Sequence, residues 1–160
     1  MDQNASIPFL RHTLATLAYR GAKTLRGAPD GFASFRAAES TRTPAQILAH
    51  IGDLFDWAIA MADGRMEWHD SVPLAWPDET ARFFATLGRF DARLASGEPL
   101  GMTVEKLFQG PVADSFTHFG QIAMLRRMAG APVRGESYFR ADIVTGRVGP
   151  EQAPPKREFD

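Results

Sequence analysis

Apolar residues recur every three or four positions in four segments of the chain, the spacing that places them on one face of a helix. The segments have the approximate bounds Ser6–Arg26, Thr43–Gly64, Pro77–Gly97 and Pro111–Gly130. The residues that define the four apolar faces are Leu10, Leu14, Leu17, Leu25, Ile47, Ile51, Leu54, Ala58, Met61, Phe83, Leu87, Phe90, Leu94, Ile122, Leu125 and Met128. Four helices with one apolar face each bury these faces most simply against one another. The pattern therefore predicts an all-α fold, an antiparallel four-helix bundle.

Local signals mark the start of the second helix. In "TPAQ", Thr43 suits the N-cap, Pro44 the first helical position and Gln46 the reciprocal position of a capping box. Glycines stand at or just past the ends of the four segments, as is common where helices terminate. They are Gly27, Gly64, Gly97 and Gly130.

Outside the four segments the sequence predicts little regular structure. Residues 32–40, "FASFRAAES", predict at most one or two further helical turns, and residues 140–148, "RADIVTGRV", are the candidate for a short extended piece. The last stretch is rich in proline and charge, which is typical of a tail that lies over the helices or frays. We therefore expect a four-helix bundle domain at residues 1–135 and an extended, irregular C-terminal tail at residues 136–160.

Composition and charge narrow the class of partner. Of the 160 residues, 44% are hydrophobic and 23% are charged, and the formal net charge is −1 with the basic residues dispersed. A dispersed, balanced charge argues against nucleic acid and against an anionic membrane as partner. The sequence shows neither a membrane-spanning apolar run nor a secretory signal pattern, so we expect a cytoplasmic protein. Because there is no cysteine, a metal could be held only by His, Asp and Glu.

Polar side chains interrupt two of the apolar faces. In the fourth helix, Asp114 and His118 are four residues apart, and Gln121 follows in line with Leu125. In the second helix, His50 lies within the apolar face. We expect all of these polar side chains to point toward the bundle axis. Two imidazoles and one carboxylate that converge there can bind one divalent metal ion, and three protein ligands leave a coordination position open for catalysis or ligand binding.

Simpler explanations exist for each residue. Asp114 can accept a hydrogen bond from His118 or place negative charge near the start of its helix, and His50 can be an ordinary core histidine. Asp53 is a candidate to orient the second ring nitrogen of His50 or to accept a proton, or it is a solvated helix residue. Gln121 is a candidate to hydrogen-bond a ligand or a metal-binding group, or it pairs with another helix. The sequence does not identify the catalytic residues, and these two are the candidates.

One further histidine, His69, stands in the loop sequence "GRMEWHDSVP" beside Trp68. It can line the rim of a pocket, but the ordinary polarity of a loop explains it equally well. We therefore leave His69 outside the expected metal site.

Two motifs resemble those of the DinB-like (YfiT-like) metal-dependent four-helix-bundle family. "TPAQILAHIGDLFDWAIAMADG" is similar to the family's second helix, where a histidine follows an "iL.H" pattern, and "HFGQIAMLRRMAG" is similar to its "HRGQI…LLRxxG" segment. The resemblance covers the chain from the first helix to Gly130. It implies an antiparallel four-helix bundle that is commonly a homodimer and that carries a three-histidine site for a divalent metal. On these motifs, His50 and His118 match two of the three metal ligands.

The chain departs from the family pattern at Asp114, where the family usually has histidine. Aspartate is a competent ligand that favours Mn²⁺ or Fe²⁺ slightly more than imidazole does, with Zn²⁺ and Ni²⁺ still compatible. Because aspartate is shorter than histidine, its presence can also mean that this chain has lost the metal site of the family. Family members with known activity include transferases and isomerases in which the metal activates a low-molecular-weight thiol.

The leading hypothesis is a small metalloprotein in which His50, Asp114 and His118 bind one ion. It would act on a small-molecule substrate, as a thiol-dependent transferase or as a hydrolase with a metal-activated nucleophile. The alternative is a metal-free helical bundle that binds a small ligand or dimerises without catalysis.

Overall fold

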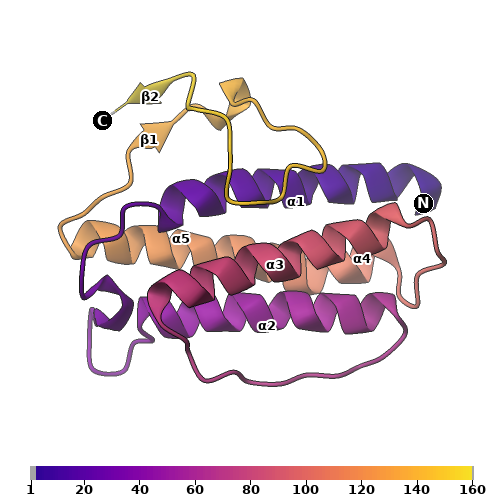
Figure 1. Ribbon diagram of the computed structural model, residues 1–160, viewed down its shortest axis with the longest axis horizontal. Coiled ribbons are helices and arrows are strands. Elements are labelled where there is room, and N and C mark those ends of the chain that lie inside the picture. Colours follow the sequence, from indigo (N-terminus) through magenta and orange to yellow (C-terminus); the bar gives the residue numbers. More distant parts are fainter. Residues whose placement is uncertain (1–2, 160) are drawn as a thin grey trace.

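The computed structural model describes residues 3–159 and is mostly helical, which confirms the prediction of an all-α fold. Its four long helices lie alongside one another (Figure 1). They are α1 (Gln3–Leu25), α2 (Pro44–Ala62), α3 (Trp76–Ala95) and α5 (Ala113–Met128). Both α3 and α5 pack against α1 and also against α2. None of the helices in the described residues has the length and apolar character that a membrane span requires.

Short elements connect the long helices and follow them. These are the single 3-10 turn η1 (Phe32–Ser34), the short helix α4 (Val104–Leu107), the π-helical turn η2 (Phe108–Val112), the strand β1 (Gly135–Glu136), the 3-10 turn η3 (Tyr138–Arg140) and the strand β2 (Glu158–Phe159).

The start and stop signals of α2 act as the sequence predicts. The Thr43 hydroxyl accepts a hydrogen bond from the backbone N–H of Gln46 at 3.2 Å, and the Gln46 side chain accepts one from the Thr43 N–H at 2.9 Å. This capping box satisfies two backbone donors that a helix start leaves unpaired. Gly64 follows the helix with a φ of 76°, a left-handed conformation that glycine adopts without a steric penalty.

The helical run that leads into α5 begins at Val104, earlier than the expected start near Pro111, although α5 itself begins at Ala113. The Thr103 hydroxyl caps α4, and the chain then stays helical through η2 into α5. Pro111 lies inside the π-helical turn η2. Proline lacks an N–H and its ring clashes with the carbonyl four residues back, so an α-helix accepts it poorly in its interior. A π turn is a local change of the hydrogen-bond pattern, which explains how the helical run passes Pro111.

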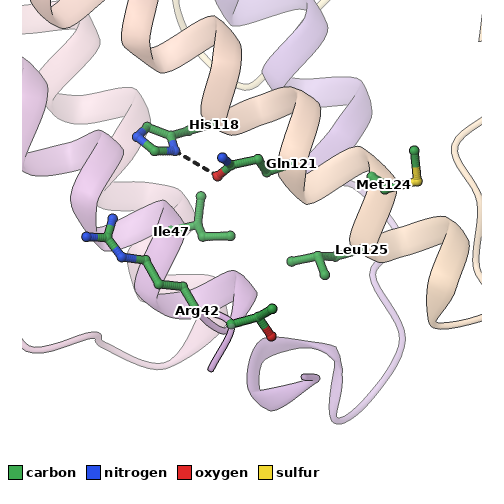
Figure 2. A pocket seen from close by; sticks show the side chains of 7 residues that line it. Arg42, Ile47, His118, Gln121, Met124 and Leu125 are labelled. Carbon is green, nitrogen blue, oxygen red and sulfur yellow. Dashed lines mark hydrogen bonds between the residues drawn. The ribbon is translucent and has the colours of Figure 1, made fainter. Parts of the chain in front are cut away.

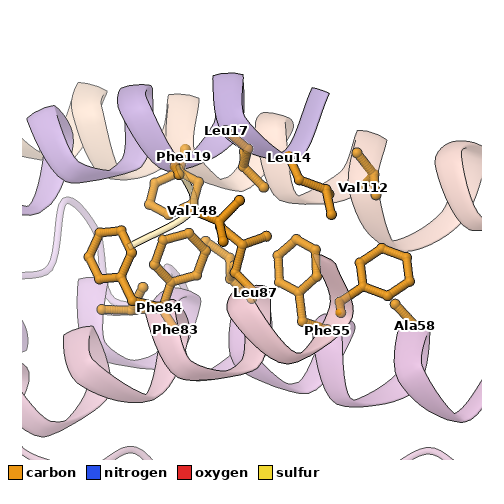
Figure 3. Close-up of a cluster of buried hydrophobic side chains, with 14 of the residues drawn as sticks. Leu14, Leu17, Phe55, Ala58, Phe83, Phe84, Leu87, Val112, Phe119 and Val148 are labelled. Carbon is orange, nitrogen blue, oxygen red and sulfur yellow. The ribbon is translucent and has the colours of Figure 1, made fainter. Parts of the chain in front are cut away.

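The apolar faces meet in one core, to which all four long helices contribute (Figure 3). Of the residues predicted to define those faces, all except Met128 are buried. The largest fully buried side chains include Leu14, Leu17, Phe55, Phe83, Phe90 and Ile122.

Met128 is 55% exposed, so its predicted burial is wrong. An α-helix has about 3.6 residues per turn, so each step of three residues from Ile122 rotates the side chain further from the buried face. The four-residue step instead brings Arg126 into the interior. There its guanidinium donates to the backbone carbonyls of Thr24 and Arg26 at the end of α1, at 2.9 and 2.8 Å.

The C-terminal segment folds back onto α1. Glu136 in β1 accepts hydrogen bonds from Tyr19 at 2.5 Å and Lys23 at 2.7 Å. β1 pairs antiparallel with β2 at the end of the described chain, and both lie beside α1 (Figure 1). The extended piece expected at residues 140–148 is not a strand. The paired strands instead flank that stretch, because the tail must turn within it to bring its two ends together.

Candidate metal centre

The structure brings His50, Asp114 and His118 together between two neighbouring helices. His50 comes from α2, and the other two side chains stand one turn apart on α5. One carboxylate oxygen of Asp114, Oδ2, lies 3.6 Å from Nε2 of His50 and 3.3 Å from Nε2 of His118. The two imidazole rings are nearly perpendicular, with centroids 4.7 Å apart. The predicted trio therefore forms one cluster.

The spacing of the donor atoms suits a single metal ion. One donor atom from each residue lies within 4.8 Å of the other two. Two ligands bound at about 2.1 Å in a tetrahedral arrangement are about 3.4 Å apart, close to the two distances to Asp114. Direct hydrogen bonds between a ring N–H and a carboxylate are shorter, at about 2.7–2.9 Å. The chemistry and spacing of these three residues thus fit a divalent cation.

The cluster lies at the edge of the interface between α2 and α5, which corrects the expectation that its side chains point toward the bundle axis. The side chains of His50 and His118 are 20% and 13% exposed, Asp114 is 46% exposed, and Gln121 is exposed. The buried face of α5 runs instead through Phe119 and Ile122. Asp114 and His118 are each rotated by about 100° around the helix axis from the buried residue that follows them. This rotation places both side chains at the margin of the buried face.

Gln121 selects the ring nitrogen that His118 presents to the cluster. Its amide oxygen, Oε1, lies 2.9 Å from Nδ1 of His118, and so accepts a hydrogen bond from the Nδ1–H. In that neutral tautomer, the lone pair is on Nε2, the atom that faces Asp114. Partners of this kind commonly orient histidines that bind metals. The sequence-based role of Gln121 as a partner of a metal-binding group is the one that this geometry supports.

An aromatic side chain packs against His50. The ring of Trp68, in the loop between α2 and α3, meets the His50 imidazole in a T-shaped contact with centroids 5.5 Å apart, and the Trp57 ring makes a similar contact with Trp68 at 5.8 Å. Burial lowers the pKa of His50, and charge on His118 and Arg42 lowers it further, whereas Asp114 opposes the shift without reversing it. His50 is therefore neutral near pH 7, which is the state in which imidazole binds a metal.

Two cavities flank the cluster. One, of about 450 Å³, has His118 and Gln121 in its wall together with Ile47 and Leu125 (Figure 2). The other, of about 220 Å³, is lined by His50 and by more polar residues. Arg42 lines both cavities. A small molecule can therefore approach the donor atoms from either side.

Asp53 has other partners than the one expected. Its carboxylate accepts hydrogen bonds from the backbone N–H of Ser71 at 2.8 Å and from Arg82 at 2.5 Å, and none of its hydrogen bonds in the described chain comes from His50. Burial opposes ionisation of Asp53, but the hydrogen bonds from Ser71 and Arg82 outweigh it and hold its pKa below the ordinary value. Asp53 therefore attaches the loop after α2 to the helices and does not orient His50.

A second group of possible ligands, which sequence reasoning missed, surrounds Asp53. Nε2 of His69 lies 3.1 Å from Asp53 and 3.4 Å from Asp56. Arg82 donates to both carboxylates, at 2.5 and 3.0 Å, and so supplies the positive charge that a metal would otherwise bring. The spacing of Asp53 and Asp56 along α2 could have signalled a shared face, but nothing in the sequence places the loop residue His69 beside them.

Comparison of the chain with models of protein families, with curated proteins and with solved structures found no match in any of the three.

Proposed function

We propose that this chain is a small divalent-metal-binding protein, an antiparallel four-helix bundle of the DinB-like type, in which His50, Asp114 and His118 hold one ion. The observation that carries the proposal is the convergence of their three donor atoms within 4.8 Å at the margin of two helices. The distances from Asp114 to the two imidazoles exceed those of ordinary direct hydrogen bonds, which supports a bridging cation over a carboxylate simply shared by two histidines.

The ion would be Zn²⁺, Ni²⁺, Mn²⁺ or Fe²⁺, because two imidazoles and one carboxylate suit all of these. When bound, it would supply the Lewis acidity that lowers the pKa of a water or of a low-molecular-weight thiol. The surrounding residues suit that role: Gln121 directs Nε2 of His118 toward the cluster, and the Trp68 ring packs against His50. The adjoining cavities leave room for a substrate, as a transferase or hydrolase requires.

The test is the metal content of protein purified without an affinity tag and incubated with each of the four ions. We expect about one equivalent of metal in the native protein, a large loss in Asp114→Ala and retention in Asp114→His, since histidine supplies an equivalent ligand. The control is His69→Ala, which removes a half-exposed histidine from the second group and should leave the metal content unchanged. A native protein that holds no more metal than Asp114→Ala would refute the proposal in favour of a metal-free bundle.

A further inference from the structure

The 450 Å³ cavity beside His118 joins an apolar wall to a cationic rim. Ile47, Met124 and Leu125 form the apolar part, and Met124 is 57% exposed although it is a large hydrophobic residue. Figure 2 shows Met124 and Leu125 at one end of the cavity and His118 at the other, with the Arg42 guanidinium toward the His118 end. The cavity is thus polarised along its length.

Among residues 3–159, Arg42 has no anionic partner. No hydrogen bond or ion pair joins it to any other residue in the part of the chain that the structure describes. By contrast, Arg11, Arg82 and Arg93 each form an ion pair with a carboxylate. Arg42 and His50 both line the smaller cavity, which places the guanidinium beside the cluster. A guanidinium at this position is available to pair with an anion in the cavity.

The wall of the cavity offers an anion further hydrogen-bond donors, and no carboxylate is among its described lining residues. Gln121 uses its amide oxygen for His118, which leaves the amide N–H groups free to donate. The described residues that line this cavity include no carboxylate, whereas Asp53 and Asp70 line the smaller cavity on the other side of Arg42. Negative charge is therefore favoured in the larger cavity and disfavoured in the smaller one.

From this arrangement we infer that the larger cavity binds a small amphipathic carboxylate. Its carboxylate pairs with Arg42 near His118, and its apolar chain lies on Ile47, Met124 and Leu125. A carboxylate suits a single guanidinium because the two planar groups match in a bidentate pair. The inference names the class of substrate for the proposed function: a monocarboxylate with a medium-length apolar chain. That this ligand is a substrate rests on the proposed function.

The experiment measures binding of octanoate and of its uncharged counterpart octanamide by isothermal titration calorimetry. Both probes are titrated into metal-loaded protein and into protein treated with chelator. We expect octanoate to bind at least about fivefold more tightly than octanamide in both forms, as one charge-assisted pair allows. Equal affinities for the two probes, or no binding of octanoate, would overturn the inference.

Variants locate the interaction. Arg42→Gln should abolish the preference for octanoate and leave octanamide binding unchanged, whereas Met124→Asp should weaken both probes by placing a charge on the apolar wall. Arg42 and Met124 are exposed, so neither change threatens the core. The matched control is Arg127→Gln, which makes the same change of charge on an exposed arginine outside the cavity and should alter neither affinity. A loss in Arg127→Gln equal to that in Arg42→Gln would show only general charge attraction and would refute the site.

The proposed metal function and the proposed carboxylate site can be refuted independently of each other. If the protein holds no metal but the chelator-treated form still prefers octanoate through Arg42, the carboxylate site stands and the proposed metal function falls. If the metal binds as proposed and the preference for octanoate is missing, the metal function stands and the carboxylate site falls.

Discussion

At the scale of single residues, the hydrogen bond from His118 to Gln121 decides which ring nitrogen faces Asp114. A neutral imidazole carries one N–H, and the acceptor at Nδ1 holds that hydrogen away from the cluster. Gln121 lies on the solvent side of α5, so its side chain makes no contribution to the core. Its effect on metal binding can therefore be separated from its effect on folding.

We predict that Gln121→Leu lowers metal affinity by about 10- to 100-fold, the range typical for loss of a partner that orients a metal-binding histidine. Gln121→Glu keeps an oxygen acceptor at the same reach and should retain or increase the affinity. Competition with a chromophoric chelator measures the dissociation constants of the native protein and of both variants. Native-like affinity in Gln121→Leu would mean that the orientation of His118 does not depend on this bond.

At the scale of elements, Arg82 connects α3 to α2 by ion pairs, and through Asp53 to the loop between the two helices. From α3 it donates to Asp53 and Asp56 on α2, and to Glu79 on its own helix at 3.1 Å. Asp53 and Glu79 are almost completely buried, with 3% and 0% of their side chains exposed. Asp53 in turn holds Ser71 of the loop that carries Trp68 over His50. The wall of the candidate metal centre therefore depends on a charge network outside it.

Arg82→Met should lower the free energy of unfolding by about 3–5 kcal/mol, since it leaves two buried carboxylates without their cation. Arg89→Met is the matched control: Arg89 also pairs with Asp56, at 2.7 Å, but its side chain is 61% exposed. An exposed pair contributes at most about 1 kcal/mol, so this variant should be close to native. Urea denaturation measures both, and equal losses would contradict the assignment of the network to Arg82.

At the scale of the whole molecule, the features that could be predicted from the sequence are those set by residues close together in the chain. The helices and the one-turn pairing of Asp114 with His118 are local, and their spacing along the chain was enough to place them. The turn at Pro111 was missed because a proline inside a helix and a proline at a helix start have the same sequence signature. The contacts of His69 with Asp53, and of Glu136 with Tyr19, join distant parts of the chain by loops whose path no local pattern encodes.

Two other contacts between distant parts of the chain, those of Asp53 with Ser71 and Arg82, make the stability of the whole molecule depend on pH. Hydrogen bonds from Ser71 and Arg82 outweigh burial and hold the pKa of Asp53 below its ordinary value, so folding favours the carboxylate. The unfolded chain binds the proton more readily, at a pKa of about 3.9. The stability that Asp53 contributes is therefore fully present above that value and is lost as the pH falls through the lower pKa of the folded state.

Asp53→Asn should accordingly be less stable than the native protein at pH 7, by about 1–3 kcal/mol, because an amide cannot replace the charge that pairs with Arg82. Below about pH 4 the native protein itself loses this contribution, so the difference between the two should shrink as the pH falls toward 2. Urea denaturation at a series of pH values between 2 and 7 measures the difference. Asp30→Asn removes an exposed carboxylate and should follow the native protein throughout. A difference between native protein and Asp53→Asn that stays constant down to pH 2 would show that packing, and not the ionised carboxylate, is what Asp53 contributes.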